Sequence, residues 1–184
     1  LTRMKLQLAM IKDVDLSRKL SSDIDDMEKM LNEYLEFART GSHVATDTFD
    51  FSELVKNTVN EYSKNIKISL TEKIYFNGRK NLIKRCIVNI LNNSIKYSEK
   101  IEIYLRKENS NIILTLDDDG PGVPEDEYKN IIKPFYKIDK SRSGKSSVGL
   151  GLSIVSDIVR SHGGDISFKK SQIGGLSVMI SLPS

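Results

Sequence analysis

The sequence is poor in several residue types that mark particular classes of protein. Its 184 residues include one cysteine, Cys86, so it cannot close an intrachain disulfide, and two histidines give little basis for a zinc site. No hydrophobic run approaches the roughly 18 residues of a membrane-spanning helix, and the charges among residues 1–11 exclude a signal-peptide core. The formal net charge of +3 is too small to indicate nucleic-acid binding. These absences indicate an ordinary globular protein of a reducing compartment.

Residues 1–40 contain neither proline nor glycine, which suits long helices. Their hydrophobic residues recur at steps of four and three on either side of a polar segment, 12–19, as a helical stripe does. The stripe consists of Leu1, Met4, Leu8, Ile11, Leu20, Ile24, Met27, Leu31, Tyr34 and Ala38. We predict an antiparallel helical hairpin that dimerises into a four-helix bundle, because two helices cannot bury the stripe alone. The alternative is one helix packed on the following domain.

The remainder of the chain has a different pattern. Residues 41–48 are predicted to be a linker after a helix-breaking segment, and residues 49–184 a second domain. We expect helices over 51–66, 82–97 and 149–162, and strands over 66–70, 74–76, 101–105, 112–116, 166–168 and 176–182. The strands come in adjacent pairs with helices between the pairs. This order predicts an α+β fold, a two-layer α/β sandwich whose mixed sheet has helices on one face.

One stripe of the helix over 82–97 combines amides with positive charges. Arg85, Asn89, Asn93 and Lys96 follow one another at steps of four, four and three, so they share one side of the helix. Asparagine is a poor helix former, amide oxygens can ligate Mg²⁺, and the cations can contact phosphate oxygens. Taken alone, however, the stripe is more readily explained as a solvated helix face.

Two glycine-containing segments are suited to binding a nucleotide. Residues 118–122 read Asp-Asp-Gly-Pro-Gly directly after a strand, where a carboxylate can accept from an exocyclic amine and glycine lets the backbone approach a flat ring. Residues 149–152 read Gly-Leu-Gly-Leu at the start of a helix, whose free N–H groups bind anions. Each segment alone fits an acidic turn or a closely packed helix start, and neither a Walker A nor a GxGxxG motif is present.

The segment over 118–147 approaches 30 residues with only a small helix expected after Pro124. Loops of this length are usually functional and are often lids. Phe135 lies within it, in the run Lys-Pro-Phe-Tyr-Lys of residues 133–137. The alternative for Phe135 is an aromatic that simply pins the loop.

The order of these segments resembles the N, G1, F and G2 boxes of bacterial sensor histidine kinases, whose ATP-binding domain has the GHKL, or Bergerat, fold. The hairpin resembles their dimerisation and phosphotransfer domain. The resemblance implies binding of ATP and Mg²⁺, transfer of the γ-phosphate to a hairpin histidine in a homodimer, and relay to an aspartate of a response-regulator receiver domain. It also implies that the chain is the cytoplasmic portion of an inner-membrane sensor, and that this portion contacts neither membrane nor nucleic acid.

The resemblance also implies roles for individual residues. Asn93 matches the Mg²⁺ ligand, Asp118 the aspartate that accepts from the adenine amine, and Phe135 the aromatic that anchors the lid. The other matching positions line the phosphates, the base and the far hinge of the lid, and they are Asn89, Lys96, Tyr97, Gly120, Gly122, Gly149, Leu150, Gly151 and Leu152.

The sequence departs from the family at several positions. Ser94 replaces a common alanine, and Ser147 a common glycine at one lid hinge. Neither His43, in the linker, nor His162, at a helix end, lies on the hairpin, so we expect neither to accept phosphate. The resemblance puts the acceptor about two helical turns before Leu1, and we expect the chain to be a fragment that starts just past it.

Two other functions stay open at this point. One is a degenerate, dimeric nucleotide-binding scaffold without phosphotransfer; the intact Asn93 and Asp118 argue against lost nucleotide binding but not against lost transfer. The other is a GHKL protein of another family, such as an anti-sigma serine kinase, or the ATPase part of a gyrase or an Hsp90-type chaperone. These proteins should lack the hairpin.

Overall fold

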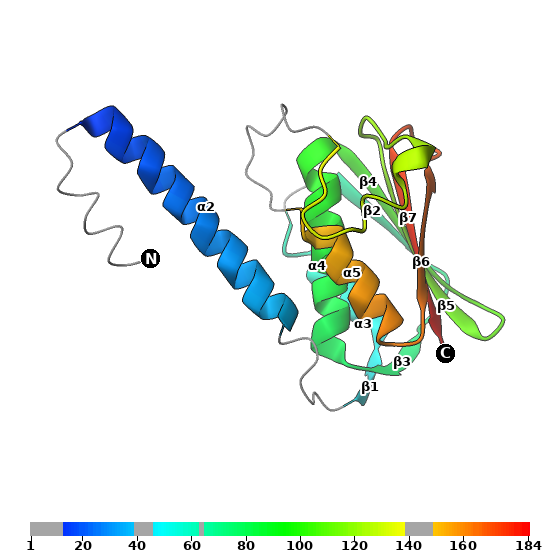
Figure 1. Cartoon of the computed structure of the whole chain (residues 1–184). Coiled ribbons are helices and arrows are strands. Elements are labelled where there is room, and N and C mark those ends of the chain that lie inside the picture. Colours follow the sequence, from blue (N-terminus) through cyan, green and yellow to red (C-terminus); the bar gives the residue numbers. More distant parts are fainter. Residues whose placement is uncertain (1–12, 39–45, 63–64, 139–148) are drawn as a thin grey trace. The chain divides into compact units, whose positions relative to one another are not determined.

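The computed structural model describes residues 13–38, 46–62, 65–138 and 149–184 (Figure 1). They fall into two units, one containing helix α2 (Val14–Ala38) and the other formed by residues 43–138 and 149–184. The first helix of the predicted hairpin, over 1–11, lies outside the described residues. None of the helices in the described ranges combines the length and apolar character that crossing a bilayer requires.

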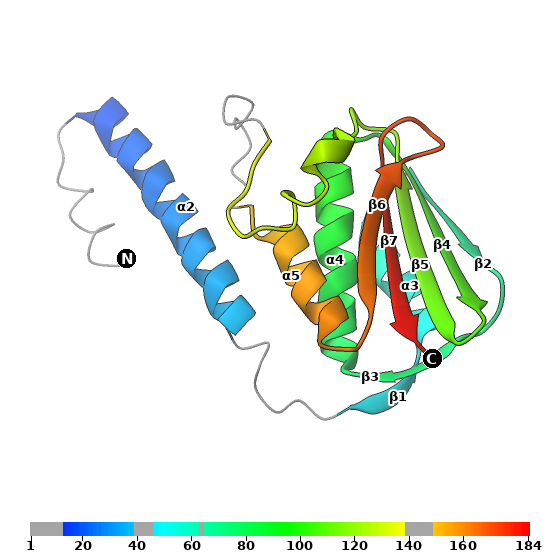
Figure 2. The same ribbon diagram turned by 45° about the vertical axis from the view of Figure 1, so that its right-hand side comes forward.

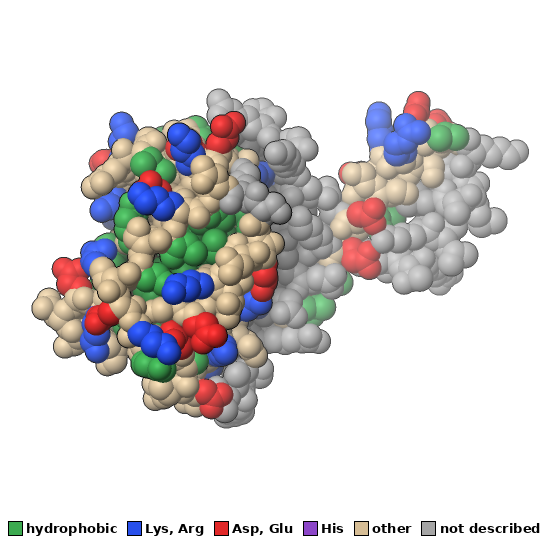
Figure 3. Space-filling view, turned by 180° about the vertical axis from the view of Figure 1, so that it is seen from behind, with side chains coloured by type: hydrophobic (Ala, Val, Ile, Leu, Met, Phe, Trp, Pro, Cys, Tyr) green, Lys and Arg blue, Asp and Glu red, His purple; other side chains and the backbone are tan. Residues whose placement is uncertain are grey.

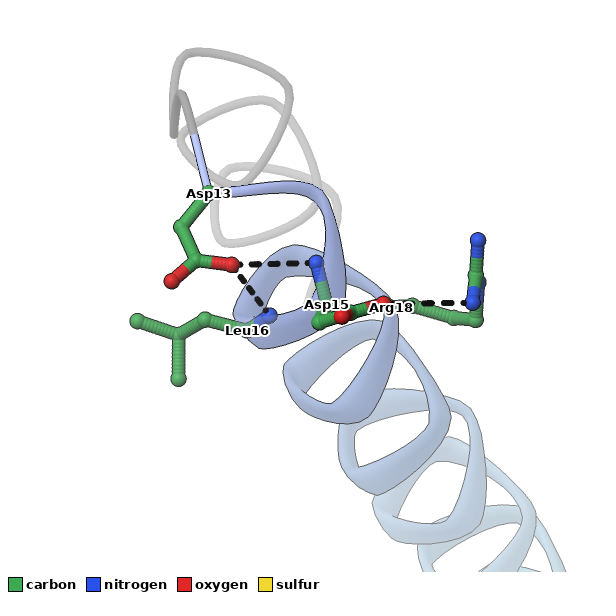
Figure 4. Close-up of polar contacts among 4 residues, drawn as sticks. All are labelled: Asp13, Asp15, Leu16 and Arg18. Atoms are coloured by element: carbon green, nitrogen blue, oxygen red, sulfur yellow. Dashed lines mark hydrogen bonds and ion pairs between the residues drawn. The ribbon is translucent and has the colours of Figure 1, made fainter.

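Helix α2 begins earlier than the sequence pattern predicts. The Asp13 carboxylate accepts from the N–H groups of Asp15 and Leu16, at 3.0 Å each, and so caps the first turn (Figure 4). The polar residues over 14–19, which we predicted to separate two helices, are therefore helical. The side chains of Met27, Leu31 and Leu35 are exposed at steps of four along this helix.

The second unit is built on a five-stranded mixed sheet (Figure 2). In spatial order its strands are β2 (Asn65–Leu70), β4 (Lys100–Glu108), β5 (Asn111–Asp118), β7 (Leu176–Pro183) and β6 (Asp165–Lys170). Strands β2 and β4 are parallel, and the other neighbours are antiparallel. Sequence-adjacent strands thus pair in β4–β5 and β6–β7, as predicted, but the expected pairing of the strand over 66–70 with the one over 74–76 is wrong, because β2 pairs with β4 instead.

Helices α3 (Phe51–Val59), α4 (Lys80–Tyr97) and α5 (Gly151–Arg160) cover one face of this sheet (Figures 1 and 2). Helix α4 packs against both α3 and α5. Its buried hydrophobic side chains are Leu82, Ile83, Cys86, Ile87, Ile90 and Leu91. Burial raises the pKa of the Cys86 thiol, as expected for an unreactive core cysteine. The predicted α+β fold with helices on one face of a mixed sheet is confirmed.

A small second sheet closes one end of the domain. Strand β1 (Asp47–Asp50) pairs antiparallel with β3 (Tyr75–Gly78). The rings of Phe49, Phe51 and Phe76 pack together here, with centroids 5.9–6.2 Å apart. Residues 47 and 48, which we predicted to be linker, therefore belong to the second unit.

Helix α3 is shorter than predicted, because the pattern over 51–66 serves two elements. It begins where the Asp50 carboxylate accepts from the Glu53 N–H at 2.9 Å, and it ends at Val59. Ile66 fits the helical spacing that begins at Val55, but it also alternates with Ile68 in strand β2, and the strand is what forms.

Charged side chains of both signs are interspersed over the face opposite to Figure 1, around a central area of hydrophobic side chains (Figure 3). No single sign dominates this face. The arrangement agrees with the small net charge of the sequence.

Candidate nucleotide-binding site

The Asp118 carboxylate is held at the end of β5 by three hydrogen bonds. Its Oδ1 accepts from the N–H groups of Gly120 and Leu176, at 3.0 Å each, and its Oδ2 accepts from the Ser94 hydroxyl at 3.2 Å. Asp118 is 5% exposed. Strands β5 and β7 and helix α4 all contribute to this small polar centre, so the fold fixes the carboxylate rather than leaving it to solvent.

Two glycines allow the backbone to come this close to the carboxylate. A Cβ on Gly120 would lie 2.9 Å from the Tyr97 carbonyl oxygen and 3.1 Å from Asp118 Oδ1. A Cβ on Gly175 would overlap both Asp118 Oδ1 and the Gly120 nitrogen. The Gly175 N–H also donates to the Asp118 carbonyl at 2.9 Å. Gly120 was predicted from the sequence, whereas Gly175 was missed.

Asp119 has a structural role beside this centre. Its Oδ1 accepts from the N–H groups of Lys100 and Glu99, at 2.9 and 2.8 Å, and these bonds lower the pKa of the Asp119 carboxyl. They tie the loop after β5 to the start of β4. The adjacent turn is completed by Gly122, whose φ of +72° suits glycine.

The asparagine stripe of α4 lies along the same helix as Ser94. Asn89 and Asn93 are both partly buried. The Asn89 amide nitrogen Nδ2 is buried and has no hydrogen-bond partner. A buried amide nitrogen left unpaired is costly, so a protein that keeps one usually has a ligand or water to satisfy it. This atom is the clearest indication of a ligand in the described part of the chain.

The start of α5 lies near the backbone of Asn89. A Cβ on Gly151 would be 4.0 Å from the Asn89 backbone carbonyl oxygen. Leu150 is buried, and its carbonyl accepts from Ser153 Oγ at 2.8 Å, which fixes the first turn of the helix. The first N–H groups of a helix have no partner within it, so they can bind an anion here.

Two more of the predicted site residues, Lys96 and Tyr97, lie at the C-terminal end of α4. Tyr97 is 51% exposed, and Lys96 Nζ lies 4.9 Å from the centre of its ring. Asn89 and Tyr97 are eight positions apart, which corresponds to about 12 Å along the helix axis. One helix thus joins a polar centre at Asp118 to a helix start suited to phosphate.

The segment around Phe135 is tied down by its backbone and not by its ring. The Phe135 N–H donates to the Gly149 carbonyl at 2.9 Å, with φ values of +64° at Phe135 and +80° at Gly149. The Phe135 side chain is 60% exposed. The anchoring of a lid by this ring stays a prediction, and the contact that the structure shows for this segment is the backbone hydrogen bond to Gly149. Residues 139–148, with Ser147 among them, lie outside the described residues.

A polar network braces this backbone pairing. Tyr136 donates its hydroxyl to Glu127 Oε2 at 2.5 Å, and Asn130 donates to the same oxygen at 3.0 Å. Lys133 in turn donates to Asn130 at 2.7 Å. The Tyr136 hydrogen bond is the main reason why the pKa of Glu127 lies below its usual value. The short helix η2 (Glu125–Glu127) is thereby connected to the base of the loop.

His162 holds two helices together. Its Nε2 accepts from the Arg79 N–H at 3.1 Å, so Nδ1 carries the proton and donates to the Ile158 carbonyl at 2.7 Å. Burial lowers the pKa of the ring. With both ring nitrogens engaged, His162 has the environment of a structural histidine; His43 lies outside the described residues.

No cluster of three or more His, Cys, Asp or Glu side chains in the described ranges could hold a metal ion. A cation at this site would therefore rely on amide and phosphate oxygens. The partly buried Asn93, one turn from the unpaired Asn89 amide, is a suitable amide ligand for Mg²⁺.

Comparison with known proteins agrees with this geometry. The family model for histidine kinase-, DNA gyrase B-, and HSP90-like ATPases matches residues 78–184. The chain belongs to this family. The matched range includes all the predicted site residues and the missed Gly175, and domains of this family bind ATP.

Relatives within the family are sensor histidine kinases. Over its whole length the chain is 30% identical to the sensor histidine kinase GtrS of Pseudomonas aeruginosa and 30% identical to CpxA of Escherichia coli. These matches cover 39% and 44% of the two proteins, so the chain spans about two fifths of their length. Residues 78–184 accordingly form an ATP-binding domain of the kind that histidine kinases contain.

Solved structures confirm the fold. The histidine kinase AdeS of Acinetobacter baumannii superposes with a TM-score of 0.68 at 20% identity. The match covers 98% of this chain and 92% of that one.

Proposed function

We propose that residues 49–184 bind ATP together with Mg²⁺, with the adenine at Asp118 and the phosphates between Asn89 and the start of α5. The unpaired, buried side-chain amide of Asn89, a residue whose backbone carbonyl lies near that helix start, is the observation that carries the proposal. An unpartnered donor and a helix N-terminus both favour a phosphate oxygen. The fixed Asp118 carboxylate lies at the other end of the proposed site and accepts a hydrogen bond from the adenine amine.

The remaining site residues take roles that follow from their positions. Asn93 ligates Mg²⁺, and Lys96 and Tyr97 line the nucleotide from the end of α4. Gly120 and Gly122 let the backbone approach the base, while Gly149, Leu150, Gly151 and Leu152 present the turn and helix start to the phosphates. When bound, Mg²⁺ neutralises the charge of the phosphate oxygens. Phe135 forms the base of the loop through its backbone.

The reaction that fits this site is transfer of the ATP γ-phosphate to a histidine of a helical hairpin. An imidazole nitrogen forms a bond to the γ-phosphorus as the bond to the β–γ bridging oxygen breaks, and ADP leaves with that oxygen. The chain's own residues contribute by positioning the nucleotide and stabilising its charge. His162 is not the acceptor, because both of its ring nitrogens are engaged.

The hairpin over 1–40 is proposed to make a homodimer and to receive a response-regulator domain, with 41–46 as the linker before strand β1. The exposed Met27, Leu31 and Leu35 of α2 support the dimer, since a row of large apolar side chains at helical spacing favours a partner helix. The regulator would take the phosphate on an aspartate. In the intact protein this portion would be the cytoplasmic part of an inner-membrane sensor that belongs to a two-component signalling system.

The experiment that tests this proposal follows labelled γ-phosphate. The full gene product is incubated with ATP labelled at the γ position and Mg²⁺, alongside the Asp118→Ala variant. We expect an acid-labile, base-stable label on the wild-type protein and none on the variant. ATP binding without any label would favour the scaffold alternative, and an acid-stable label would favour a serine kinase of the same fold.

A further inference from the structure

Asp118 has only one acceptor position left open. A carboxylate oxygen offers two lone-pair positions. On Oδ1 both are used, by the N–H groups of Gly120 and Leu176. On Oδ2 one is used, by the Ser94 hydroxyl at 3.2 Å. A single position on Oδ2 therefore remains for a donor from the nucleotide.

Ser94 is well placed to control that position. It is 2% exposed and lies in the interior of α4, where its carbonyl accepts from both the N–H and the hydroxyl of Ser98, at 2.9 and 2.7 Å. A helical serine often returns its hydroxyl proton to the carbonyl one turn earlier. Here the one hydroxyl proton goes across to Asp118, in a contact between side chains 24 residues apart.

We propose that Ser94 is a positioning residue that orients the Asp118 carboxylate, so that it presents one acceptor position to one N–H of the base and selects purines with a 6-amino group. This inference rests on the proposed binding of adenine nucleotides at the same site. Without the hydroxyl, Oδ2 has two open positions and the buried carboxylate can be satisfied by water. The difference in binding free energy between a base with the 6-amino group and a base without it then becomes smaller.

The test measures base selectivity and not affinity alone. Dissociation constants for ADP and for purine riboside 5′-diphosphate, which lacks the 6-amino group, are measured by calorimetry on the whole chain. The variants are Ser94→Ala, Ser94→Thr and Thr58→Val. Thr58 is a matched control, since its buried hydroxyl donates to the Leu54 carbonyl at 2.7 Å in α3, outside the site.

We expect the wild-type preference for ADP to fall about fivefold in Ser94→Ala, the effect of losing one ordinary hydrogen bond. It should be retained in Ser94→Thr, which keeps the hydroxyl, and in Thr58→Val. A purely structural role for Ser94 would weaken both nucleotides equally and leave the preference unchanged, which would overturn the inference.

Two further results keep the test decisive. If Ser94→Ala does not fold, Ser94→Cys, which keeps the size but offers a weak donor, should show an intermediate preference; an unchanged preference would count against the inference. If the wild-type chain binds no ADP, the proposed function fails and the inference with it. Binding of ADP with an unaltered preference in Ser94→Ala rejects the inference alone.

Discussion

Gly175 shows how a residue without a functional group can control a binding site. A methyl group at this position would overlap Asp118 Oδ1 and the Gly120 nitrogen, so Gly175→Ala must displace the carboxylate or the loop that holds it. We predict that ADP binding to Gly175→Ala is weakened at least about tenfold, the loss expected when a charge-assisted hydrogen bond is removed. Calorimetric titration with ADP measures this directly.

The neighbouring glycine supplies the control. A Cβ on Gly174 meets no atom within 4 Å, although its φ of +122° makes any side chain strained. Gly174→Ala should therefore lose stability without a comparable loss of ADP affinity. Equal losses of affinity in the two variants would show that general disturbance of the loop, and not the contact with Asp118, is responsible.

Individual site residues were predictable from the sequence to different degrees. Asp118 and Gly120 belong to a local motif, which the structure brings together as expected. Gly175 is 57 residues farther along the chain from Asp118, and only the pairing of β5 with β7 brings it there. The Gly174–Gly175 pair before the last strand was the available signal. The exposed ring of Phe135 depends on a positive φ, which a sequence pattern does not reveal.

At the scale of elements, the junction between α4 and α5 contains a group that is sensitive to pH. His162 near the end of α5 accepts from the Arg79 N–H at the N-cap of α4, and the Arg79 side chain bonds the Ser161 carbonyl at 3.1 Å. Burial is the main cause of the lowered pKa of His162, and the nearby Arg79 charge adds to it. Protonation of the ring removes the acceptor at Nε2.

The sign of the pH dependence follows from this shift. The unfolded chain takes up a proton at His162 near pH 6.5, while the folded protein takes it up at a lower pH. The contribution of His162 to the free energy of unfolding is therefore complete above pH 6.5. It is lost as the pH falls from 6.5 through the lowered pKa. We predict that the free energy of unfolding declines over this range in the wild-type protein and declines less in His162→Gln.

Denaturant unfolding at a series of pH values between 7.5 and about 5 checks this prediction. The carboxyl groups with lowered pKa, among them Asp119 and Glu127, titrate below this window and do not interfere. His162→Gln should be less stable at pH 7.5 but should have the flatter profile. Parallel profiles would mean that another group is responsible.

The backbone pairing of Phe135 with Gly149 is a second local structure that can be tested, because Gly149 leaves no room for a side chain. A Cβ on Gly149 would lie 2.8 Å from the Tyr136 carbonyl oxygen, at a φ of +80°. We predict that Gly149→Ala breaks the pairing of Phe135 N–H with the Gly149 carbonyl and weakens ATP binding several-fold. The exposed Phe135→Ala should have a much smaller effect, because the contact is made by its backbone.

Measuring ATP dissociation constants for both variants distinguishes the two roles. A larger loss of ATP affinity in Phe135→Ala than in Gly149→Ala would identify the ring as the anchor.

At this scale the sequence predicted which elements exist better than where they end. Helix α3 ends early because Ile66 serves the strand spacing, and α2 starts early because Asp13 caps it.

At the scale of the whole molecule, the fold follows from the order of apolar segments. Paired strands with helices between them predicted a mixed sheet covered on one face, and the observed order β2-β4-β5-β7-β6 has that form. The small sheet of β1 and β3 was not predicted as a pair, since its strands have four residues each and their paired residues lie 25–31 positions apart. Short strands of this kind carry little periodicity of their own.

The same scale explains why one helix organises the site. Helix α4 is buried on one side against the core, its Ser94 hydroxyl contacts Asp118 at the end of β5, and its Asn89 backbone lies near the start of α5. The base, the metal and the phosphates would therefore all be contacted by residues of one rigid helix, which keeps the distances between their binding positions fixed without a large conformational change.

The most direct measurement is calorimetric titration of the chain with ADP, with and without Mg²⁺, beside Asp118→Ala, Asn93→Ala and Asn92→Ala. Asn92 is the matched control, because it is exposed and its amide oxygen accepts from the Tyr62 hydroxyl at 3.2 Å, away from the stripe. We predict saturable, Mg²⁺-dependent binding to the wild-type chain and to Asn92→Ala. Asp118→Ala should abolish it, and Asn93→Ala should remove the dependence on Mg²⁺. A folded wild-type protein that binds no ADP at millimolar concentration would contradict the account.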